Sequence, residues 1–267
     1  MGIHLLILIL FVWLAPHVAF SAEPGCLNCH ASHYEDWGNC NFCHRGIQKT
    51  GRKDIAHHGL IVGRYAFFRF PEDPIIEQGK QLLSAFACRR CHTAGKMGNH
   101  LSADLDTRSN NLQPDEIFAA IKLPSSFMPD FRFTQPQLVA LVNRILFNSA
   151  LRVQAKNEVP LVIHFDVDRT SDKNPFNQYC GKCHKVLTTQ DGGLGEGEIG
   201  PNLSGLLSEF YPQTFKGQEP WTSDSLEKWL KNPRKIKKTS QMSPVLLQMK
   251  EFLQLLKLMG VSVPAKK

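Results

Sequence analysis

Eight cysteines form four Cys-x-x-Cys pairs, and a histidine directly follows each pair. Cysteines three residues apart can form two thioether bonds to one edge of a haem, and the adjacent histidine then lies under the iron as its proximal ligand. With 11 histidines among 267 residues, four such followers would arise by chance with a probability of about three in a million. The pattern predicts four covalently bound haem c groups. The attachment cysteines are Cys26, Cys29, Cys40, Cys43, Cys88, Cys91, Cys180 and Cys183, and the proximal ligands are His30, His44, His92 and His184.

Two other uses of paired cysteines explain this pattern less well. Four thiolates can hold zinc, but zinc requires nothing of the residue that follows a cysteine pair. Disulfides are common in exported proteins, but a bond between cysteines three positions apart closes a strained, reducible ring. Neither alternative accounts for the four histidines, so haem attachment is the preferred interpretation.

The repeated motif resembles that of the multihaem c-type cytochromes, and the resemblance extends over essentially the whole chain after its first 22 residues. It implies an electron carrier that works with redox partner proteins. The chain has 31 basic and 24 acidic residues, a formal net charge of +7. About eight propionates from four haems would nearly cancel this charge, so no nucleic acid partner is expected.

The first residues are typical of an export signal. Leu5 to Ala15 are apolar without interruption, and Ala19-Phe20-Ser21 is a small-x-small cleavage pattern. The apolar run is short for a bilayer span. We therefore expect a signal peptide over residues 1–22 and a periplasmic protein with peripheral or no membrane contact. An uncleaved membrane anchor is the alternative, because Met1 to His4 contain no lysine or arginine.

Residues 23–70 contain two attachment motifs in fewer than fifty residues. A segment of this length is too short to build a hydrophobic core of its own. We therefore expect a compact dihaem segment with little regular structure, in which the two porphyrins are most of what is packed.

The sixth ligand of each iron decides between electron transfer and substrate chemistry. His33 is too close in sequence to His30 to reach round the same porphyrin, but it can reach the haem of His44. We therefore expect His33 to bind that iron, and His57 or His58 to bind the iron of His30. In the alternative, these histidines lie at the surface and one iron is open.

Residues 71–150 resemble a class I cytochrome c. A helical pattern over 75–86 leads to the third cysteine pair, Met128 follows in a loop with proline on both sides, and an apolar helical pattern covers 138–146. The resemblance implies that Met128 is the distal ligand of His92. The Gly-Pro-x-Leu motif of that family, whose proline carbonyl orients the proximal histidine, lacks its proline here and reads Gly98-Asn99-His100-Leu101, so this contact is in doubt.

Residues 172–267 resemble the same family more completely. Gly200-Pro201-Asn202-Leu203 carries the proline, and Asp224-Ser225-Leu226-Glu227 is a capping box expected to open a helix. The resemblance implies that Met242 is the distal ligand and that Trp229 lines the haem pocket.

Two further expectations concern the end of the chain and the segment between the class I units. Met249 and Met259 fall on the apolar stripe of a terminal helix and are expected in the core. Residues 151–171 show no haem pattern and are expected to connect the two units. The whole sequence therefore predicts a mainly α-helical protein.

These ligand sets imply a carrier with two lower-potential and two higher-potential haems, because bis-histidine ligation lowers and His/Met ligation raises the potential. We expect it to transfer electrons between a membrane quinol-oxidising complex and a terminal reductase in anaerobic respiration. The alternative is a haem enzyme, an oxyanion reductase or a peroxidase, with one open iron. Residues 33–39 and 52–58 more weakly resemble tetrahaem cytochromes associated with selenite or tellurite reduction in metal-respiring bacteria.

A basic stretch precedes Met242 and has two interpretations. It can dock an acidic redox partner, as class I cytochromes often do around the exposed haem edge, or it can neutralise propionates. Its residues are Lys231, Arg234, Lys235, Lys237 and Lys238.

Overall fold

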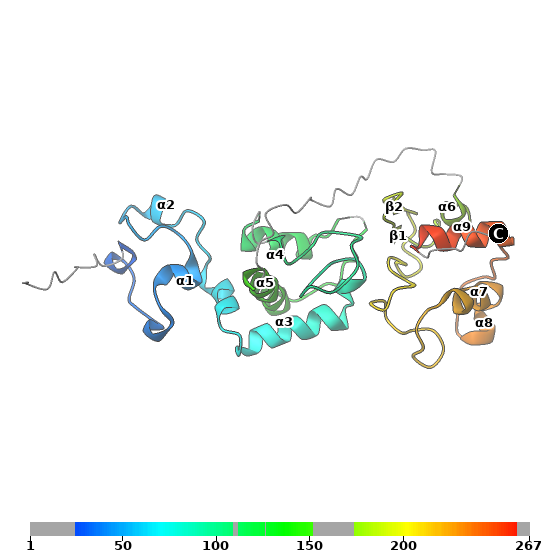
Figure 1. Cartoon of the computed structure of the whole chain (residues 1–267), viewed down its shortest axis with the longest axis horizontal. Coiled ribbons are helices and arrows are strands. Elements are labelled where there is room, and N and C mark those ends of the chain that lie inside the picture. The colour runs from blue at the N-terminus through cyan, green and yellow to red at the C-terminus, as the bar shows by residue number, and fades with distance from the viewer. Residues whose placement is uncertain (1–24, 109–111, 126, 152–173, 261–267) are drawn as a thin grey trace, which may run out of the picture.

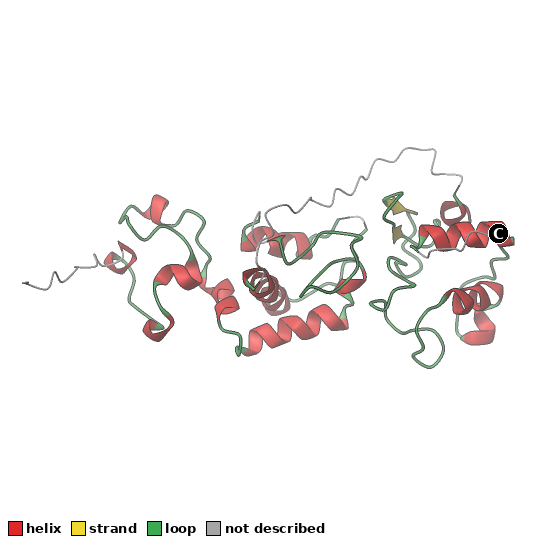
Figure 2. Cartoon of the chain, viewed as in Figure 1, coloured by secondary structure: helices red, strands yellow, loops and turns green. Residues whose placement is uncertain are grey.

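The computed structural model describes residues 25–108, 112–125, 127–151 and 174–260. Three units follow one another along the molecule: a first unit up to residue 70, a middle unit over residues 71–151 and a last unit over residues 174–260 (Figure 1). Helices dominate the regular structure (Figure 2), which confirms the mainly α fold expected from the sequence. The predicted signal peptide and all but the first residue of the predicted connector lie outside the described residues.

The first unit consists of short helical turns joined by loops. The turns η1 and η2 and the helices α1 and α2 contain no buried residue, so this part of the chain has no packed core of its own. The fifth element, the turn η3, buries Tyr65, Ala66 and Phe68. The bounds are Gly25–Asn28 for η1, Glu35–Trp37 for η2, Cys40–His44 for α1, Lys53–Ala56 for α2 and Gly63–Arg69 for η3.

The η3 turn fastens the first unit to the middle unit. Tyr65 is fully buried in the core of the middle unit, and its hydroxyl donates a hydrogen bond to Asp115 Oδ1 at 2.9 Å. Asn143, which is also fully buried, donates from Nδ2 to the carbonyl of Arg64 at 2.9 Å. The first unit is therefore attached to the core of the middle unit through η3.

The middle unit is built on the packing of α3 (Pro74–Ala85) against α5 (Gln135–Ala150), with η4 (Cys88–Arg90) and α4 (Pro114–Lys122) beside them. The Asp73 carboxylate caps α3 by accepting a hydrogen bond from the Ile75 amide at 2.9 Å. Apolar side chains of α3, α4 and α5 form its core. Both helices expected from the apolar periodicity are therefore present.

The last unit contains the two described strands. These strands, β1 (Val186–Leu187) and β2 (Gly193–Leu194), form a two-stranded antiparallel sheet in which Val186 pairs with Leu194. The helices enclose a core that includes Phe176, Leu230 and Leu255. Their bounds are Pro175–Tyr179 for α6, Ser223–Lys231 for α7, Pro233–Ile236 for α8 and Met249–Leu258 for α9. Over the described ranges, every helix is too short or too polar to cross a bilayer.

Two details of the last unit differ from the sequence expectations. The helix expected to open at the Asp224 capping box begins earlier, because extended Thr222 is the N-cap and exchanges hydrogen bonds with Ser225. Met249 is 59% exposed because it is the first residue of α9, so its placement in the core was wrong. Met259 packs against the core as expected.

Candidate haem-binding sites

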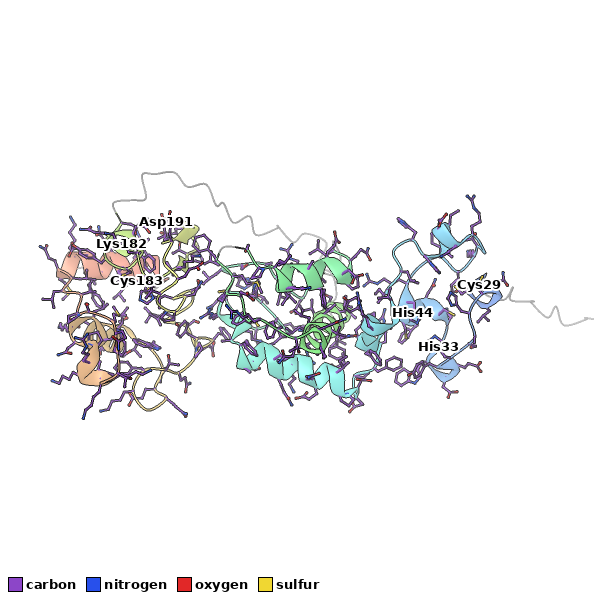
Figure 3. The ribbon with its side chains drawn as sticks, turned by 180° about the vertical axis from the view of Figure 1, so that it is seen from behind. Cys29, His33, His44, Lys182, Cys183 and Asp191 are labelled. Carbon is purple, nitrogen blue, oxygen red and sulfur yellow. The ribbon has the colours of Figure 1, made fainter. Side chains whose placement is uncertain are left out.

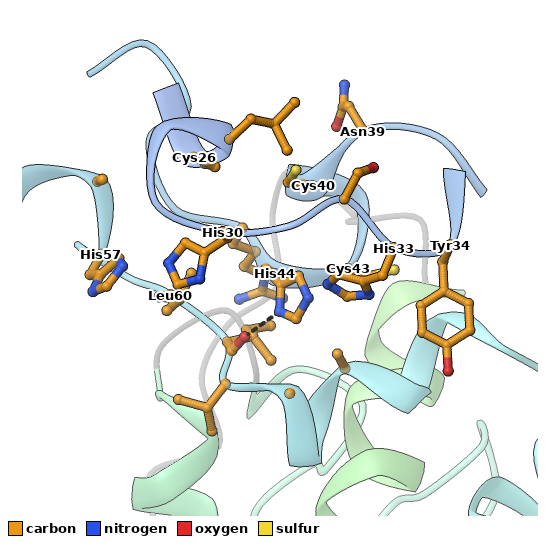
Figure 4. A pocket seen from close by; sticks show the side chains of 18 of the residues that line it. Cys26, His30, His33, Tyr34, Asn39, Cys40, Cys43, His44, His57 and Leu60 are labelled. Atoms are coloured by element: carbon orange, nitrogen blue, oxygen red, sulfur yellow. Dashed lines mark hydrogen bonds between the residues drawn. The ribbon is translucent and has the colours of Figure 1, made fainter. Parts of the chain in front are cut away.

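A large cavity lies in the first unit (Figure 4). Its volume of about 1070 Å³ is slightly above the roughly 300–1,000 Å³ that small-ligand pockets usually enclose. Both Cys-x-x-Cys-His motifs of this unit open onto it, so the two attachment sites share one space. The motif residues and additional histidines in its lining are Cys26, Cys29, His30, Cys40, Cys43, His44, His33 and His57.

Four histidines in this cavity form two facing pairs. The ring centroids of His30 and His57 are 6.0 Å apart, and those of His33 and His44 are 5.7 Å apart. A metal–imidazole nitrogen bond is about 2 Å and the ring centroid lies about 1 Å farther, so two rings on opposite sides of one iron have centroids about 6 Å apart. Both pairs therefore have the spacing of bis-histidine ligation (Figure 4). His58 is exposed and does not line the cavity.

The His44 ring is held by a backbone carbonyl. Its Nδ1 lies 2.9 Å from the carbonyl oxygen of the fully buried Ile61, the dashed line in Figure 4. A carbonyl only accepts, so Nδ1 carries the hydrogen and Nε2 is available to iron. This is the arrangement expected for a proximal haem ligand.

Positive charge lies at the same cavity, where Arg45 is one of the lining residues. Burial together with the nearby Arg69 guanidinium lowers the pKa of Arg45. A second cation nearby disfavours the charged form of Arg45, and an anion between them would relieve this repulsion. Haem propionates are such anions, so the charges of this unit also fit the group.

In the third motif, the proximal histidine donates to a backbone carbonyl that the sequence does not indicate. His92 donates from Nδ1 to the carbonyl of Ala103 at 2.7 Å, so Ala103 supplies the acceptor that the absent proline put in doubt. Burial lowers the pKa of His92, which favours the neutral imidazole that binds a metal. Burial also raises the pKa of the Cys88 thiol to about 11.

Met128 and His92 line one small cavity together with Cys88 and Cys91. Its volume of about 40 Å³ does not admit a porphyrin in this form, so the fit rests on the donor groups gathered there. Arg108 adds a further observation. Its Nε is buried with no hydrogen-bond partner in the described structure, and its charge contributes to the lowered pKa of His92. A propionate would satisfy this nitrogen.

Two residues of the fourth motif, Cys180 and His184, are buried in the last unit. His184 donates from Nδ1 to the Pro201 carbonyl at 2.7 Å, as the Gly-Pro-x-Leu resemblance implies. Burial raises the pKa of the Cys180 thiol to about 11. Trp229 donates from Nε1 to Met242 Sδ at 3.1 Å, and Met242 packs on the core cluster that contains Cys180. Among the described contacts, none joins Met242 directly to His184.

The four motifs are spread along the molecule. Cys29 and His44 lie in the unit at one end and Cys183 lies in the unit at the other (Figure 3). Among the described residues, no three histidine, cysteine or carboxylate side chains are grouped as a metal-ion site, whereas zinc held by four thiolates needs all of them to converge. All eight cysteines are free of disulfides. The described side chains therefore do not bring the thiolates of different motifs together at one point.

Residues 74–143 match the family model described as subunit III of cbb3-type cytochrome c oxidase. The match supports a c-type cytochrome domain over this range. Such a domain implies covalently bound haem c, electron transfer and redox partner proteins. No curated protein and no solved structure matches the chain.

The backbone acceptors of this protein could not have been found from residue types. Every residue has a backbone carbonyl, so Ile61 and Ala103 carry no signal in the sequence. The proline at position 201 is different, because a family motif marks its carbonyl.

Proposed function

We propose that the chain is an exported, periplasmic c-type cytochrome with four haems. It transfers electrons between a membrane quinol-oxidising complex and a terminal reductase in anaerobic respiration. Each haem would supply a one-electron Fe(III)/Fe(II) couple. The observation that carries the proposal is the pair of facing histidine couples, with ring centroids 6.0 Å and 5.7 Å apart, in one cavity with two attachment motifs.

The proposed ligand sets leave no iron open to substrate. His57 completes the site of His30, and His33 completes that of His44. In the other two units the distal ligands are Met128 and Met242. A filled sixth position favours electron transfer over substrate chemistry, and the two kinds of ligand set separate the potentials into a lower and a higher pair.

The polypeptide contributes orientation and exclusion of water. The carbonyls that accept from His44, His92 and His184 fix the plane and tautomer of each ring. Burial of His92 and His184 keeps water away from the proposed iron sites of the middle and last units. Both effects hold the proposed ligands in place without a rearrangement during each redox cycle.

An exposed basic surface near Met242 supports a protein partner. The side chains Lys231, Arg234, Lys235, Lys237 and Lys238 are exposed on α7, α8 and the segment that follows. Exposed like charges raise the association rate with an oppositely charged surface and make that rate depend on ionic strength. We propose that this surface docks an acidic redox partner.

Electron paramagnetic resonance of the oxidised holoprotein, combined with a potentiometric titration, tests the proposal. We expect low-spin signals alone, with two haems titrating at lower and two at higher potential. A high-spin signal in the native protein, together with carbon monoxide binding after reduction at neutral pH, would instead support an enzyme with an open iron.

A further inference from the structure

The middle and last units meet at Asn202. Its side-chain Nδ2 donates to the carbonyl of Phe127 at 2.9 Å, and its own carbonyl accepts from Arg90 Nη1 at 3.2 Å. Both partners belong to the middle unit. One residue of the last unit therefore makes two separate hydrogen bonds across the contact.

Each of these bonds ends next to a proposed haem ligand or attachment residue. Phe127 precedes Met128, and Arg90 precedes Cys91. On the other side, Asn202 follows Pro201, whose carbonyl holds the ring of His184. The contact thus joins the distal loop and the attachment turn of the third site to the proximal loop of the fourth.

Further contacts bring the middle and last units close together at this junction, the contact around Asn202. Asn99 Nδ2 donates both to the carbonyl of Arg90 and to Ser208 Oγ, each at 2.8 Å. A Cβ on Gly205 would overlap the carbonyl oxygen of Arg90 and lie 2.8 Å from Asn99 Nδ2. The backbones of the two units therefore approach to a distance that only glycine permits at position 205.

We propose that Asn202 is a positioning residue that holds the third and fourth haem sites at a fixed separation. The inference rests on the proposed function, because a carrier needs a constant distance between successive haems. Without the side chain of Asn202, the distal loop loses its bond to the last unit, and the two units are then free to separate by small opening motions.

The test compares Asn202→Ala with Tyr211→Phe in the full-length holoprotein. The hydroxyl of Tyr211 donates to the same Asn202 carbonyl at 3.2 Å, but this bond lies within the last unit. Phenylalanine at position 211 keeps the ring over which the Arg90 guanidinium lies. The control therefore removes a bond to Asn202 and leaves both bonds to the middle unit.

Two readouts are measured on each variant. The first is amide hydrogen exchange over residues 88–103 and 127–133, which belong to the opposite unit. The second is the rate of electron exchange between the two higher-potential haems after flash photoreduction. We expect Asn202→Ala to accelerate the hydrogen exchange by about fivefold, the effect of one lost hydrogen bond on an opening equilibrium. We also expect it to slow the electron transfer, and Tyr211→Phe to change neither quantity.

Unchanged hydrogen exchange in Asn202→Ala, with native spectra, would overturn the inference whatever the electron-transfer rate. If that variant does not mature, Arg90→Met removes the second bond from the middle-unit side, and the same two readouts apply. The hydrogen-exchange readout measures how often the contact between the two units opens, and it does so whatever group the motifs bind. A wild-type protein with the wrong haem count or spin state would contradict the proposed function, and unchanged exchange in the variant would contradict the junction alone.

Discussion

His57 and His58 are adjacent in the sequence, but His57 lines the cavity of the first unit and His58 does not. Spacing along the chain could not separate them, because both are within reach of the haem proposed at the first motif. The difference arises from the end of α2, where His57 is the C-cap and turns toward His30. The choice between His57 and His58 therefore depends on the direction of the backbone at the end of α2, which the sequence does not show.

Replacement of His57 by alanine should remove the proposed sixth ligand of one iron. We expect a high-spin signal from one haem in the oxidised protein and carbon monoxide binding in the reduced protein, because water or a small ligand can then occupy the open position. His58→Ala is the matched control and should leave both spectra unchanged. Equal effects of the two substitutions would contradict the assignment.

Replacement of Trp229 by phenylalanine should lower the potential of the haem proposed at the fourth motif. The indole N–H donates to Met242 Sδ at 3.1 Å and withdraws electron density from the sulfur, which disfavours Fe(III). A hydrogen bond of about 1 kcal/mol corresponds to a shift of about 40 mV for one electron. Potentiometric titration measures it. Trp221→Phe, which removes an indole bond to Thr214 instead, should leave the potential unchanged.

At the scale of secondary structure, α3 and α5 were predictable because each has a long apolar face with the helical period. The start of α7 was not, since several residues near it can act as an N-cap and the extended backbone of Thr222 selects one. Met249 was misplaced for a related reason. Met249 is the first residue of α9, and the apolar stripe alone does not show that this position lies outside the core.

The crossing of α3 and α5 depends on Gly79. A Cβ at this position would overlap the carbonyl oxygen of Ala140 and lie 2.6 Å from the Cβ of Arg144. Gly79→Ala should therefore lower the free energy of unfolding by about 1–3 kcal/mol, although alanine is the better helix former. Chemical denaturation measures this change. Ser84→Ala, at an exposed position of the same helix, should be neutral or slightly stabilising.

The contact between α6 and α9 should depend on pH through Glu251. Tyr179 donates to the Glu251 carboxylate at 2.6 Å, and this bond, with a second from the Gln248 amide, lowers the pKa of Glu251. The ionised carboxylate therefore stabilises the fold above the ordinary glutamate pKa, and this contribution is lost as the pH falls through the lowered value. Unfolding followed between pH 7 and pH 3 should show wild type more stable than Glu251→Gln only at the upper end. A constant difference across this range would contradict the account.

At the scale of the whole molecule, three units with haem motifs follow one another from end to end (Figure 1). The cysteine and histidine spacing predicts where haem is attached, because thioether chemistry fixes that spacing. It does not predict how the units meet. The junction at Asn202 joins small polar side chains and carbonyls far apart in the sequence, and such contacts leave no periodic pattern.

The mass of the mature protein, purified from a host that exports and assembles c-type cytochromes, tests the central claim most directly. We predict a single species whose mass equals that of the processed chain plus four covalently attached haems, one for each cysteine pair. A chain without added haem, or one that carries zinc on its thiolates, would contradict the account.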